Sequence, residues 1–460
     1  MGYIYVLERL FLQIIQGGII LKKSIIISAT TLLLVLIPNI AFAAAGKIDT
    51  GDTAFILFSS ALVMIMTPGL AFFYGGMVSG KNVISIMMQS FTIIALISVQ
   101  WVLFGFSLSF SGDIGHIIGN LHWAGLSNIG YGPDNTYSST IPLLAFMVYQ
   151  LMFAIITPAL ITGAFAERMK FAAFIIFTLL WTTLVYDPLA HWVWGDGGWL
   201  KNLGALDFAG GTVVHISSGV SGLVAALVLG KRKNMKMVPH HMPMVLMGAA
   251  FLWFGWFGFN AGSALSVSGI AVNAFVVTNT AAAAAAIGWV LTEWKLSGKP
   301  TLLGAVSGAV AGLVAITPAS GYVTPVAAIV IGIISGIICF ISVNYIKHKF
   351  GYDDSLDAFG IHGVGGTWGA LATGLFATKA INPAGSNGLF YGNPNQLLTQ
   401  LISVIVTYVF AGLMSFIILK FISLFMDLRV TKEEEEAGLD IVEHGEEAYN
   451  LGFKAINFNQ

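Results

Sequence analysis

The chain has 460 residues, of which 57% are hydrophobic and only 9% are charged. Soluble domains average about 25% charged residues, so this composition excludes an ordinary soluble protein and indicates an integral membrane protein. The formal net charge of -1 gives no reason to expect nucleic-acid binding. The single cysteine, Cys339, excludes an internal disulfide.

The first 45 residues differ from the rest of the chain. Lys22 and Lys23 precede the apolar run SIIISATTLLLVLIPNI, and AFA stands just before Ala44. A basic start, an apolar run and small residues are typical of a secretory signal peptide with its cleavage site. We therefore predict an N-terminal extension and signal peptide over 1–45; the alternative is an uncleaved membrane helix.

Residues 46–426 form the predicted membrane domain. A membrane-spanning helix needs about 20 mostly apolar residues, and eleven such segments make the expected fold all-α. They cover approximately 53–77, 83–109, 140–163, 171–189, 209–230, 243–263, 269–291, 301–317, 324–346, 357–377 and 397–425. Residues 427–460 are polar and acidic, so we interpret them as a tail that cannot span a bilayer.

Basic residues between the segments predict the orientation. If the mature N-terminus is outside, the inner loops contain eleven lysines and arginines and the outer segments contain three. This excess is the positive-inside signal. We therefore expect a multi-pass protein of the plasma membrane, with its mature N-terminus outside and its C-terminus in the cytoplasm.

Two histidines lie inside apolar segments that contain few other polar side chains. His215 is in the fifth segment and His362 in the tenth, each followed by a run of small residues. A five-segment unit inserts its second copy upside down, and such inverted repeats place a site near the midplane between the halves. At 1.5 Å per residue, the imidazoles are expected about 10 Å from opposite faces. Ionisable groups at membrane depth are costly, so the pair indicates a functional site in a central pore.

Aromatic and hydroxyl side chains are expected on the outer side of these histidines. Aromatic faces attract small cations, so the set could hold one; the alternative is the aromatic belt that Trp and Tyr form at membrane interfaces. The residues concerned are Tyr149, Phe153, Trp194, Trp256, Phe259 and Ser263.

Five motifs occur in the order of one known family: ITGAFAER, DFAGGTVVHI, WFGFNAGSA, GLVAITPASGY and FGIHGVGG. Together they resemble the Amt branch of the Amt/Mep/Rh ammonium transporter family, from about residue 50 to the end of the tail. The resemblance implies a homotrimer of eleven-helix subunits. Each subunit would combine an inverted five-plus-five repeat with one extra helix and would have its own pore.

The resemblance also implies roles for individual residues. These are ammonium recruitment by Trp194, Ser263 and Tyr149, a gate of Phe153 and Phe259, twin pore histidines His215 and His362, and supporting roles for Asp207 and Trp256. The family usually has Phe where this chain has Tyr149, whose hydroxyl could ligate the cation or orient a water. Ammonium would be deprotonated, and neutral ammonia, with or without a separate proton, would pass inward.

Several ionisable residues are better explained by structural roles. Asp207 opens the fifth helix, where a carboxylate is a good N-cap. Asp353, Asp354 and Asp357 precede the tenth helix, and we expect them to cap its N-terminus, with Asp357 the best candidate. His191 is expected near the outer surface in a solvated or capping role.

The acidic tail resembles the ordered tail of the same family through the pattern GLD…HGE…AY. We expect Gly438, Asp440, His444 and Glu446 to fix the tail. The resemblance also suggests that a PII signal protein docks at this cytoplasmic face. We expect no metal, cofactor or nucleic acid.

Three other functions were weighed against ammonium transport. An ammonium sensor usually carries a fused signalling domain, which the short tail leaves no room for. A passive channel for a neutral solute such as urea does not need a proton acceptor. An enzyme is disfavoured because neither a nucleophile–base pair nor metal-ligand spacing is present.

Overall fold

The computed structural model describes residues 47–233 and 238–449. The predicted signal peptide over 1–45 lies outside these residues. Most of the described chain is helical, and the rest consists of loops and one short antiparallel hairpin of β1 (Pro133–Asp134) and β2 (Ser138–Pro142).

Nine helical spans among the described residues are long and apolar enough to cross a membrane. The first five contain α2 (Thr50–Met64) with α3 (Met66–Met77); α4 (Val83–Gln100) with η1 (Trp101–Gly105) and α5 (Phe106–Phe110); α6 (Leu143–Phe165); α7 (Phe171–Trp181) with η3 (Thr182–Tyr186), α8 (Asp187–Trp194) and α9 (Trp199–Leu203); and η4 (Gly211–Ile216) with α10 (Ser217–Leu229). The other four contain α11 (Met242–Ala261) with η5 (Gly262–Ala264); α12 (Gly269–Ser297); α14 (Pro325–Ile341) with η6 (Ser342–Ile346) and α15 (Lys347–Phe350); and α17 (Pro394–Ile422).

Two further predicted segments coincide with helices outside this set of nine. One is α13 (Leu302–Ile316), which has only 15 residues. The other is α16 (Val364–Phe376), preceded by the π-helical turn η7 (Phe359–Gly363). The described chain thus has nine clear candidate spans, and the count of eleven stays a prediction.

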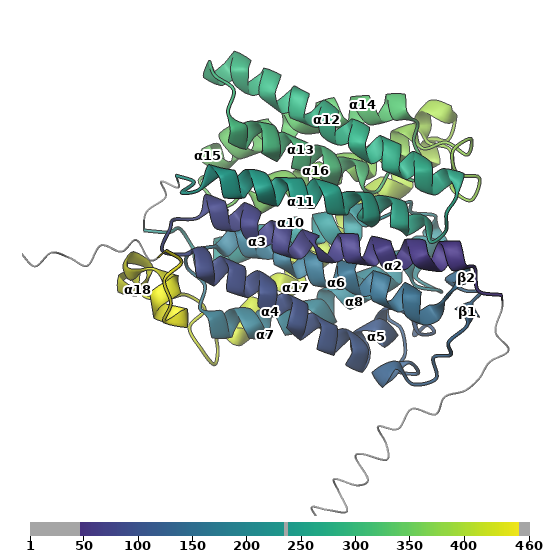
Figure 1. Cartoon of the computed structure of the whole chain (residues 1–460), viewed down its shortest axis with the longest axis horizontal. Helices are drawn as coiled ribbons and strands as arrows, with labels where there is room; N and C mark the ends of the chain where they lie inside the picture. Colours follow the sequence, from purple (N-terminus) through teal and green to yellow (C-terminus); the bar gives the residue numbers. More distant parts are fainter. Residues whose placement is uncertain (1–46, 234–237, 450–460) are drawn as a thin grey trace, which may run out of the picture.

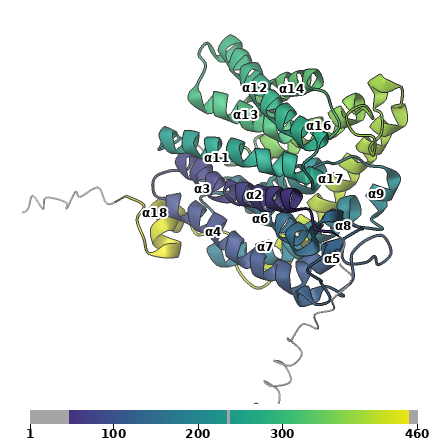
Figure 2. The same ribbon diagram turned by 45° about the vertical axis from the view of Figure 1, so that its right-hand side comes forward.

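The helices lie side by side along the long axis of the molecule (Figure 1). Helices α12, α13 and α14 pack together on one side, and α4, α5 and α7 lie on the opposite side in both ribbon views (Figure 2). The hairpin β1–β2 marks one end of the bundle, called here the hairpin end. The short helices α18 (Lys432–Ala437) and η9 (Asp440–His444) mark the other, the tail end. Loops at the two ends are therefore separated by the full length of the helices.

Of the three aspartates expected to cap the helix that carries His362, Asp354 does so, and the preferred candidate Asp357 does not. The carboxylate of Asp354 accepts the backbone N–H groups of Ala358 (3.1 Å) and Phe359 (2.8 Å). Asp357 has a left-handed backbone (φ 61°) and pairs with Lys347 at 2.6 Å instead. The prediction that Asp357 caps this helix is therefore wrong.

His191 is buried and not solvated; of the two expected roles, solvated or capping, its contact with the Ser109 carbonyl in the last turn of α5 fits the capping one. Its side chain is fully buried between α5 and α8. One ring nitrogen lies 3.1 Å from the carbonyl oxygen of Ser109, and the other lies 3.0 Å from Oδ1 of Asp113. A carbonyl can only accept, so Nδ1 of His191 donates to it and the ring anchors the loop after α5 to α8.

Small residues bring the two histidine-bearing helices into backbone contact. A Cβ placed on Gly219 of α10 would overlap the backbone of Gly363 in η7. A Cβ on Gly366 of α16 would meet Cβ of His215 at 3.0 Å. Glycines at these positions allow the close helix packing that membrane interfaces use.

The first prediction concerns this contact. We expect Gly219→Ala to destabilise the folded protein by about 1–3 kcal/mol, the usual cost of overpacking a close contact. Thermal unfolding of the detergent-purified protein, followed by size-exclusion chromatography, measures the effect. Gly269→Ala is the matched control, because nothing lies within 4 Å of a Cβ at that position. Equal unfolding temperatures for both variants would contradict the prediction.

Candidate functional site: two cavities joined by a histidine-lined lumen

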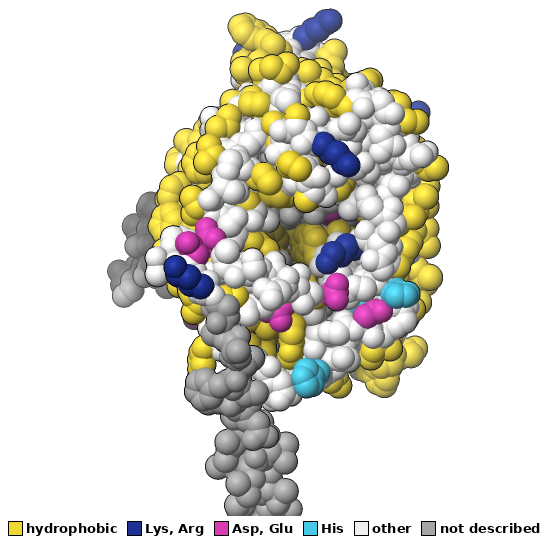
Figure 3. Space-filling model, turned by 90° about the vertical axis from the view of Figure 1, so that its right-hand side faces the viewer, with side chains coloured by type: hydrophobic (Ala, Val, Ile, Leu, Met, Phe, Trp, Pro, Cys, Tyr) yellow, Lys and Arg dark blue, Asp and Glu magenta, His cyan; other side chains and the backbone are white. Residues whose placement is uncertain are grey.

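The bundle is hollowed from both ends toward its centre. A cavity of about 390 Å³ opens at the hairpin end, where the surface is visibly hollowed (Figure 3). At the tail end, cavities of about 430 Å³ and 170 Å³ share Leu356 and Asp357. Between the ends lies a lumen of about 10 Å³, which is close to the smallest space that holds one water molecule.

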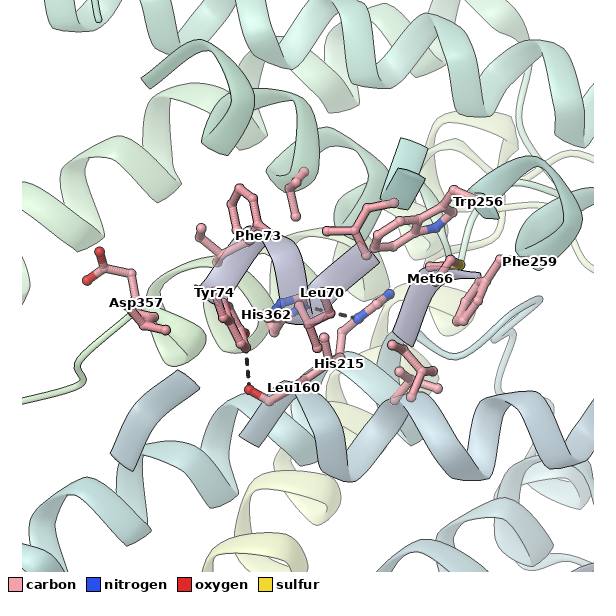
Figure 4. A pocket seen from close by; sticks show the side chains of 16 residues that line it. Met66, Leu70, Phe73, Tyr74, Leu160, His215, Trp256, Phe259, Asp357 and His362 are labelled. Carbon is pink, nitrogen blue, oxygen red and sulfur yellow. Dashed lines mark hydrogen bonds between the residues drawn. The ribbon is translucent and has the colours of Figure 1, made fainter. Parts of the chain in front are cut away.

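The lumen is apolar except for a few groups, and its lining is shown in Figure 4. Phe259 and Trp256 lie toward one end of the labelled set, and Asp357 lies at the other. Asp357 also lines both tail-end cavities. The lumen therefore leads from the region of the aromatic side chains to the tail end.

Two phenylalanines separate the hairpin-end cavity from the lumen. Phe153 lines the cavity and Phe259 lines the lumen. Their ring centroids are 4.3 Å apart with an interplanar angle of 38°. Both side chains are almost fully buried, so one of them has to move before a solute can pass between the cavity and the lumen.

The two histidines predicted to meet are in direct contact. Nδ1 of His215 lies 3.3 Å from Nδ1 of His362, and the ring centroids are 5.3 Å apart. Both rings are buried, with 1% and 4% exposure. Each lies in a π-helical turn, η4 or η7, and such turns occur frequently at functional sites. The dashed line in Figure 4 marks the contact.

The contact restricts where protons can be in the lumen. Two neutral imidazoles joined through their Nδ1 atoms share one hydrogen, so one Nδ1 donates and the other accepts. The donor ring then has a bare Nε2 and the acceptor ring has an Nε2–H. The lumen thus presents one acceptor and one donor nitrogen, and Nε2 of His215 has no hydrogen-bond partner among the described residues.

Trp256 packs against the histidine pair. Its ring centroid is 5.4 Å from that of His215, and its indole N–H donates to Oγ1 of Thr317 at 2.9 Å. Thr317 fixes the indole plane along the lumen wall. Thr317 was not expected to have this role from the sequence, although it is part of the motif GLVAITPASGY.

The three residues predicted to recruit a cation are placed differently from one another. Trp194 and Ser263 line the hairpin-end cavity. Tyr149 does not line it: the side chain is fully buried, and its hydroxyl lies 2.9 Å and 2.8 Å from the carbonyl oxygens of Gly258 and Phe259. The hydroxyl also lies 3.2 Å from Oγ of Ser263. The Tyr149 hydroxyl therefore faces the end of α11 and contacts the Ser263 hydroxyl from outside the cavity.

Comparisons with known proteins agree with this geometry. The family model described as Ammonium Transporter Family matches residues 54–449. The chain belongs to the ammonium transporter family. A relative named Ammonium transporter from Bacillus subtilis (strain 168) is 59% identical over 400 residues, which are 87% of this chain and 98% of the relative. Ammonium transporter Amt1 of Archaeoglobus fulgidus is 49% identical over 403 residues, or 87% of this chain and 99% of that protein.

Solved structures lead to the same family. The crystal structure of Saccharomyces cerevisiae Mep2 matches with a TM-score of 0.79 and 37% identity, covering 84% of this chain and 91% of that one. A structure named Sensor Amt Protein matches with a TM-score of 0.79 and 31% identity, covering 86% and 98%. The chain is thus a multi-pass membrane protein of a transporter family, and its relatives include a sensor.

Asp207 closes the helix that carries His215 in this ammonium transporter family member. Its carboxylate accepts backbone N–H groups from Gly210 (2.8 Å), Gly211 (2.6 Å) and Thr212 (2.8 Å), and also the Thr212 hydroxyl. Its backbone carbonyl accepts the indole N–H of Trp194 at 2.8 Å. Asp207 therefore caps η4, as its position suggested, and also orients Trp194.

The tail-end cavity is bordered by a buried ion network. Arg232 bridges Asp353 (2.8 Å) and Glu167 (3.0 Å). Burial raises the pKa of Asp353, but hydrogen bonds and charge from Arg232 outweigh it and lower that pKa to about 2. Arg168 donates to the carbonyl oxygens of Ala164 and Asp353. Glu167 and Arg168 thus have structural roles, Glu167 through its ion pair with Arg232 and Arg168 through its bonds to the backbone.

The tail residues lie against the tail-end loops. Asp440 accepts the N–H of Ser85 at 2.8 Å at the start of α4, and Gly438 (φ 105°) packs on Lys81. The ring of His444 lies 4.9 Å from that of Phe171. The backbone N–H of Glu446 donates to Asp440, while its side chain is exposed. Three of the four predicted tail residues thus contact the bundle through side chain or close packing.

The second prediction concerns the Asp207 cap. Asn offers one acceptor oxygen in place of two, so Asp207→Asn leaves backbone donors unpaired and should cost about 1–2 kcal/mol of stability. The unfolding temperature of the purified protein reports this loss. Asp196→Asn, at an exposed position two residues after Trp194, is the control and should leave stability unchanged. A stable Asp207→Asn variant would show that the cap is dispensable.

Proposed function

We propose that this protein transports ammonium into the cytoplasm, recruiting it at the hairpin end, deprotonating it and conducting ammonia past His215 and His362. The observation that carries the proposal is the histidine contact inside an apolar lumen that lies between two wide cavities. Family membership supports ammonium as the substrate.

Charge determines the form in which the substrate crosses. An isolated ammonium ion pays a large desolvation cost in an apolar lumen, whereas neutral ammonia does not. Trp194, Ser263 and the ring of Phe153 at the hairpin-end cavity offset part of that cost for the cation, since an aromatic face contributes about 0.5–2 kcal/mol. The aromatic pair of Phe153 and Phe259 then acts as the gate, with Tyr149 supporting Ser263.

Ammonia matches the hydrogen-bonding pattern of the histidine pair. It has one lone pair and three N–H groups, so it can accept from the Nε2–H of one ring and donate to the bare Nε2 of the other. The lumen of about 10 Å³ has no room for a hydrated ion. Trp256 forms the wall that keeps the substrate beside His215.

An inverted five-plus-five repeat accounts for the arrangement of the two halves. Each histidine lies in a π-helical turn, and each turn is capped by an aspartate eight residues earlier (215 − 207 and 362 − 354). The π-helical turns η3 and η6 likewise lie in the spans directly before. These matches support eleven membrane helices, with the hairpin end outside and the tail end in the cytoplasm.

The assembly and its regulation extend the same proposal. We place the transport domain at 46–426 and a regulatory tail at 427–460, in a homotrimer of the plasma membrane. The contacts of Asp440 with α4 and of Glu443 with the N–H of Phe171 at 3.1 Å support coupling between tail and helices. A PII signal protein is the proposed partner at this face.

The third prediction is the test of transport. Reconstituted in liposomes, the protein should give a flux after an ammonium pulse, followed as an internal pH change and a current. An electrogenic pathway gains about 2.3 kcal/mol per 100 mV for each charge moved, so current distinguishes it from passage of ammonia alone. Absence of both flux and current would overturn transport and leave the ammonium sensor, which the similarity to Sensor Amt Protein makes the second candidate. Urea flux without ammonium selectivity would indicate a neutral-solute channel.

The fourth prediction concerns the histidine pair. We expect His362→Ala to lower the ammonium flux at least about tenfold, or to reduce ammonium-over-potassium selectivity, because it removes one of the two lumen nitrogens and admits water. The same liposome assay with potassium pulses measures both effects. His122→Ala, at an exposed loop position, should behave like the parent protein. Unchanged flux and selectivity in His362→Ala would exclude the pair from the pathway.

A further inference from the structure

The hairpin-end cavity contains a lysine that the transport mechanism does not use. Lys201, in α9, lines the same cavity as Trp194 and Ser263. Its Nζ donates to the backbone carbonyl of Trp194 at 3.3 Å and lies 6.0 Å from the ring centroid of Tyr137. A carbonyl oxygen and an aromatic face are groups that bind an ammonium ion. Lys201 thus places an alkylammonium group in a cation-binding position of the cavity.

The other ligands of this position are held rigidly. The Tyr137 ring stacks on Phe146 with centroids 4.8 Å apart at 16°. Its hydroxyl donates to the carbonyl of Phe110 and accepts the N–H of Asp196 at 3.1 Å. The Trp194 indole is fixed by its bond to Asp207. The ring and the carbonyl therefore stay in place whether or not Lys201 occupies the position between them.

The charge of Lys201 is only weakly compensated, because Asp196 acts on it without forming an ion pair. Lys201 and Asp207 are the two charged side chains among the described residues that line the hairpin-end cavity. The Asp207 carboxylate is already saturated by the N–H groups of η4. None of the ion pairs within 4 Å among the described residues includes Lys201. The cavity therefore carries a lysine ammonium that is unpaired among the described residues, beside a carboxylate whose oxygens are occupied by backbone N–H groups.

We propose that Lys201 is an affinity-setting residue: its tethered ammonium occupies a cation subsite formed by the Tyr137 ring and the Trp194 carbonyl, and repels ammonium ion at the neighbouring recruitment site. The inference rests on the proposed function. Removing the charge both opens the subsite and removes the repulsion, so the protein should then saturate at lower ammonium concentration. Lys201 acts on recruitment only, because it does not line the lumen.

The test compares half-saturation concentrations for ammonium flux in liposomes. Lys201→Gln should lower the half-saturation concentration by about threefold or more, the effect of one unit charge at close range in water, while the maximal rate is unchanged. Lys201→Arg keeps the charge and should retain the parent value. Lys379→Gln is the matched control, because Lys379 is exposed in the loop after α16 and does not line the cavity.

Ionic strength gives a second readout that a purely structural role would not change. The Debye length falls from about 10 Å at 0.1 M salt to about 3 Å at 1 M, so added salt should lower the half-saturation concentration of the parent but have little effect on Lys201→Gln. If Lys201→Gln does not fold, the parent protein alone gives the test: a half-saturation concentration that stays the same or rises with added salt overturns the inference. The inference is also overturned if Lys379→Gln lowers the half-saturation concentration as much as Lys201→Gln does. It is overturned as well if Lys201→Arg does not keep the half-saturation concentration of the parent protein. If the parent protein transports ammonium and Lys201→Gln has the same half-saturation concentration, only this inference is rejected. If the parent protein gives no ammonium flux, the proposed transport function itself is rejected.

Discussion

The cost of placing a charge in an apolar, water-poor lumen is the constraint on which the rest of the structure depends. The lumen has about 10 Å³ of free space and is lined mainly by aliphatic and aromatic side chains. A cation beside the histidine pair would lose its hydration, and the carboxylate of the described lining, Asp357, lies at the tail end and is paired with Lys347. Polar and aromatic groups that can bind a cation lie in the wide hairpin-end cavity, and the two imidazoles lie in the narrow lumen.

Holding two imidazoles together at this depth requires support from the backbone. Each histidine lies in a π-helical turn, and an aspartate eight residues earlier closes each turn. Gly219 and Gly366 allow the two helices to touch. A side chain at either glycine would separate the imidazoles, so the 3.3 Å contact depends on residues that have no polar atom in the lumen.

The sequence predicts much of this arrangement and misses specific parts of it. Apolar length located the helices, and two isolated histidines with their small neighbours located the centre of the pathway. Asp357 was preferred as the cap of the second histidine helix because that residue stands closest to the helix. The equal spacing of Asp207 from His215 and of Asp354 from His362 identifies the right residue, and it was available in the sequence. The distance to the start of the helix was thus a weaker guide to the cap than the equal spacing of aspartate and histidine.

Other features could not be read from residue order because they depend on contacts between distant segments. The ring of His191 is buried against Ser109 and Asp113, some 80 positions earlier, and its two nitrogens lie within hydrogen-bond distance of them. Tyr149 suggests a hydroxyl ligand for a cation, but the carbonyl groups at the end of α11 are close enough to bind that hydroxyl first. A buried hydroxyl left without a partner would cost about 1–3 kcal/mol. The backbone carbonyls of α11 therefore determine where the Tyr149 hydroxyl points. The hydroxyl supports Ser263 and is not itself an oxygen ligand for a cation in the cavity.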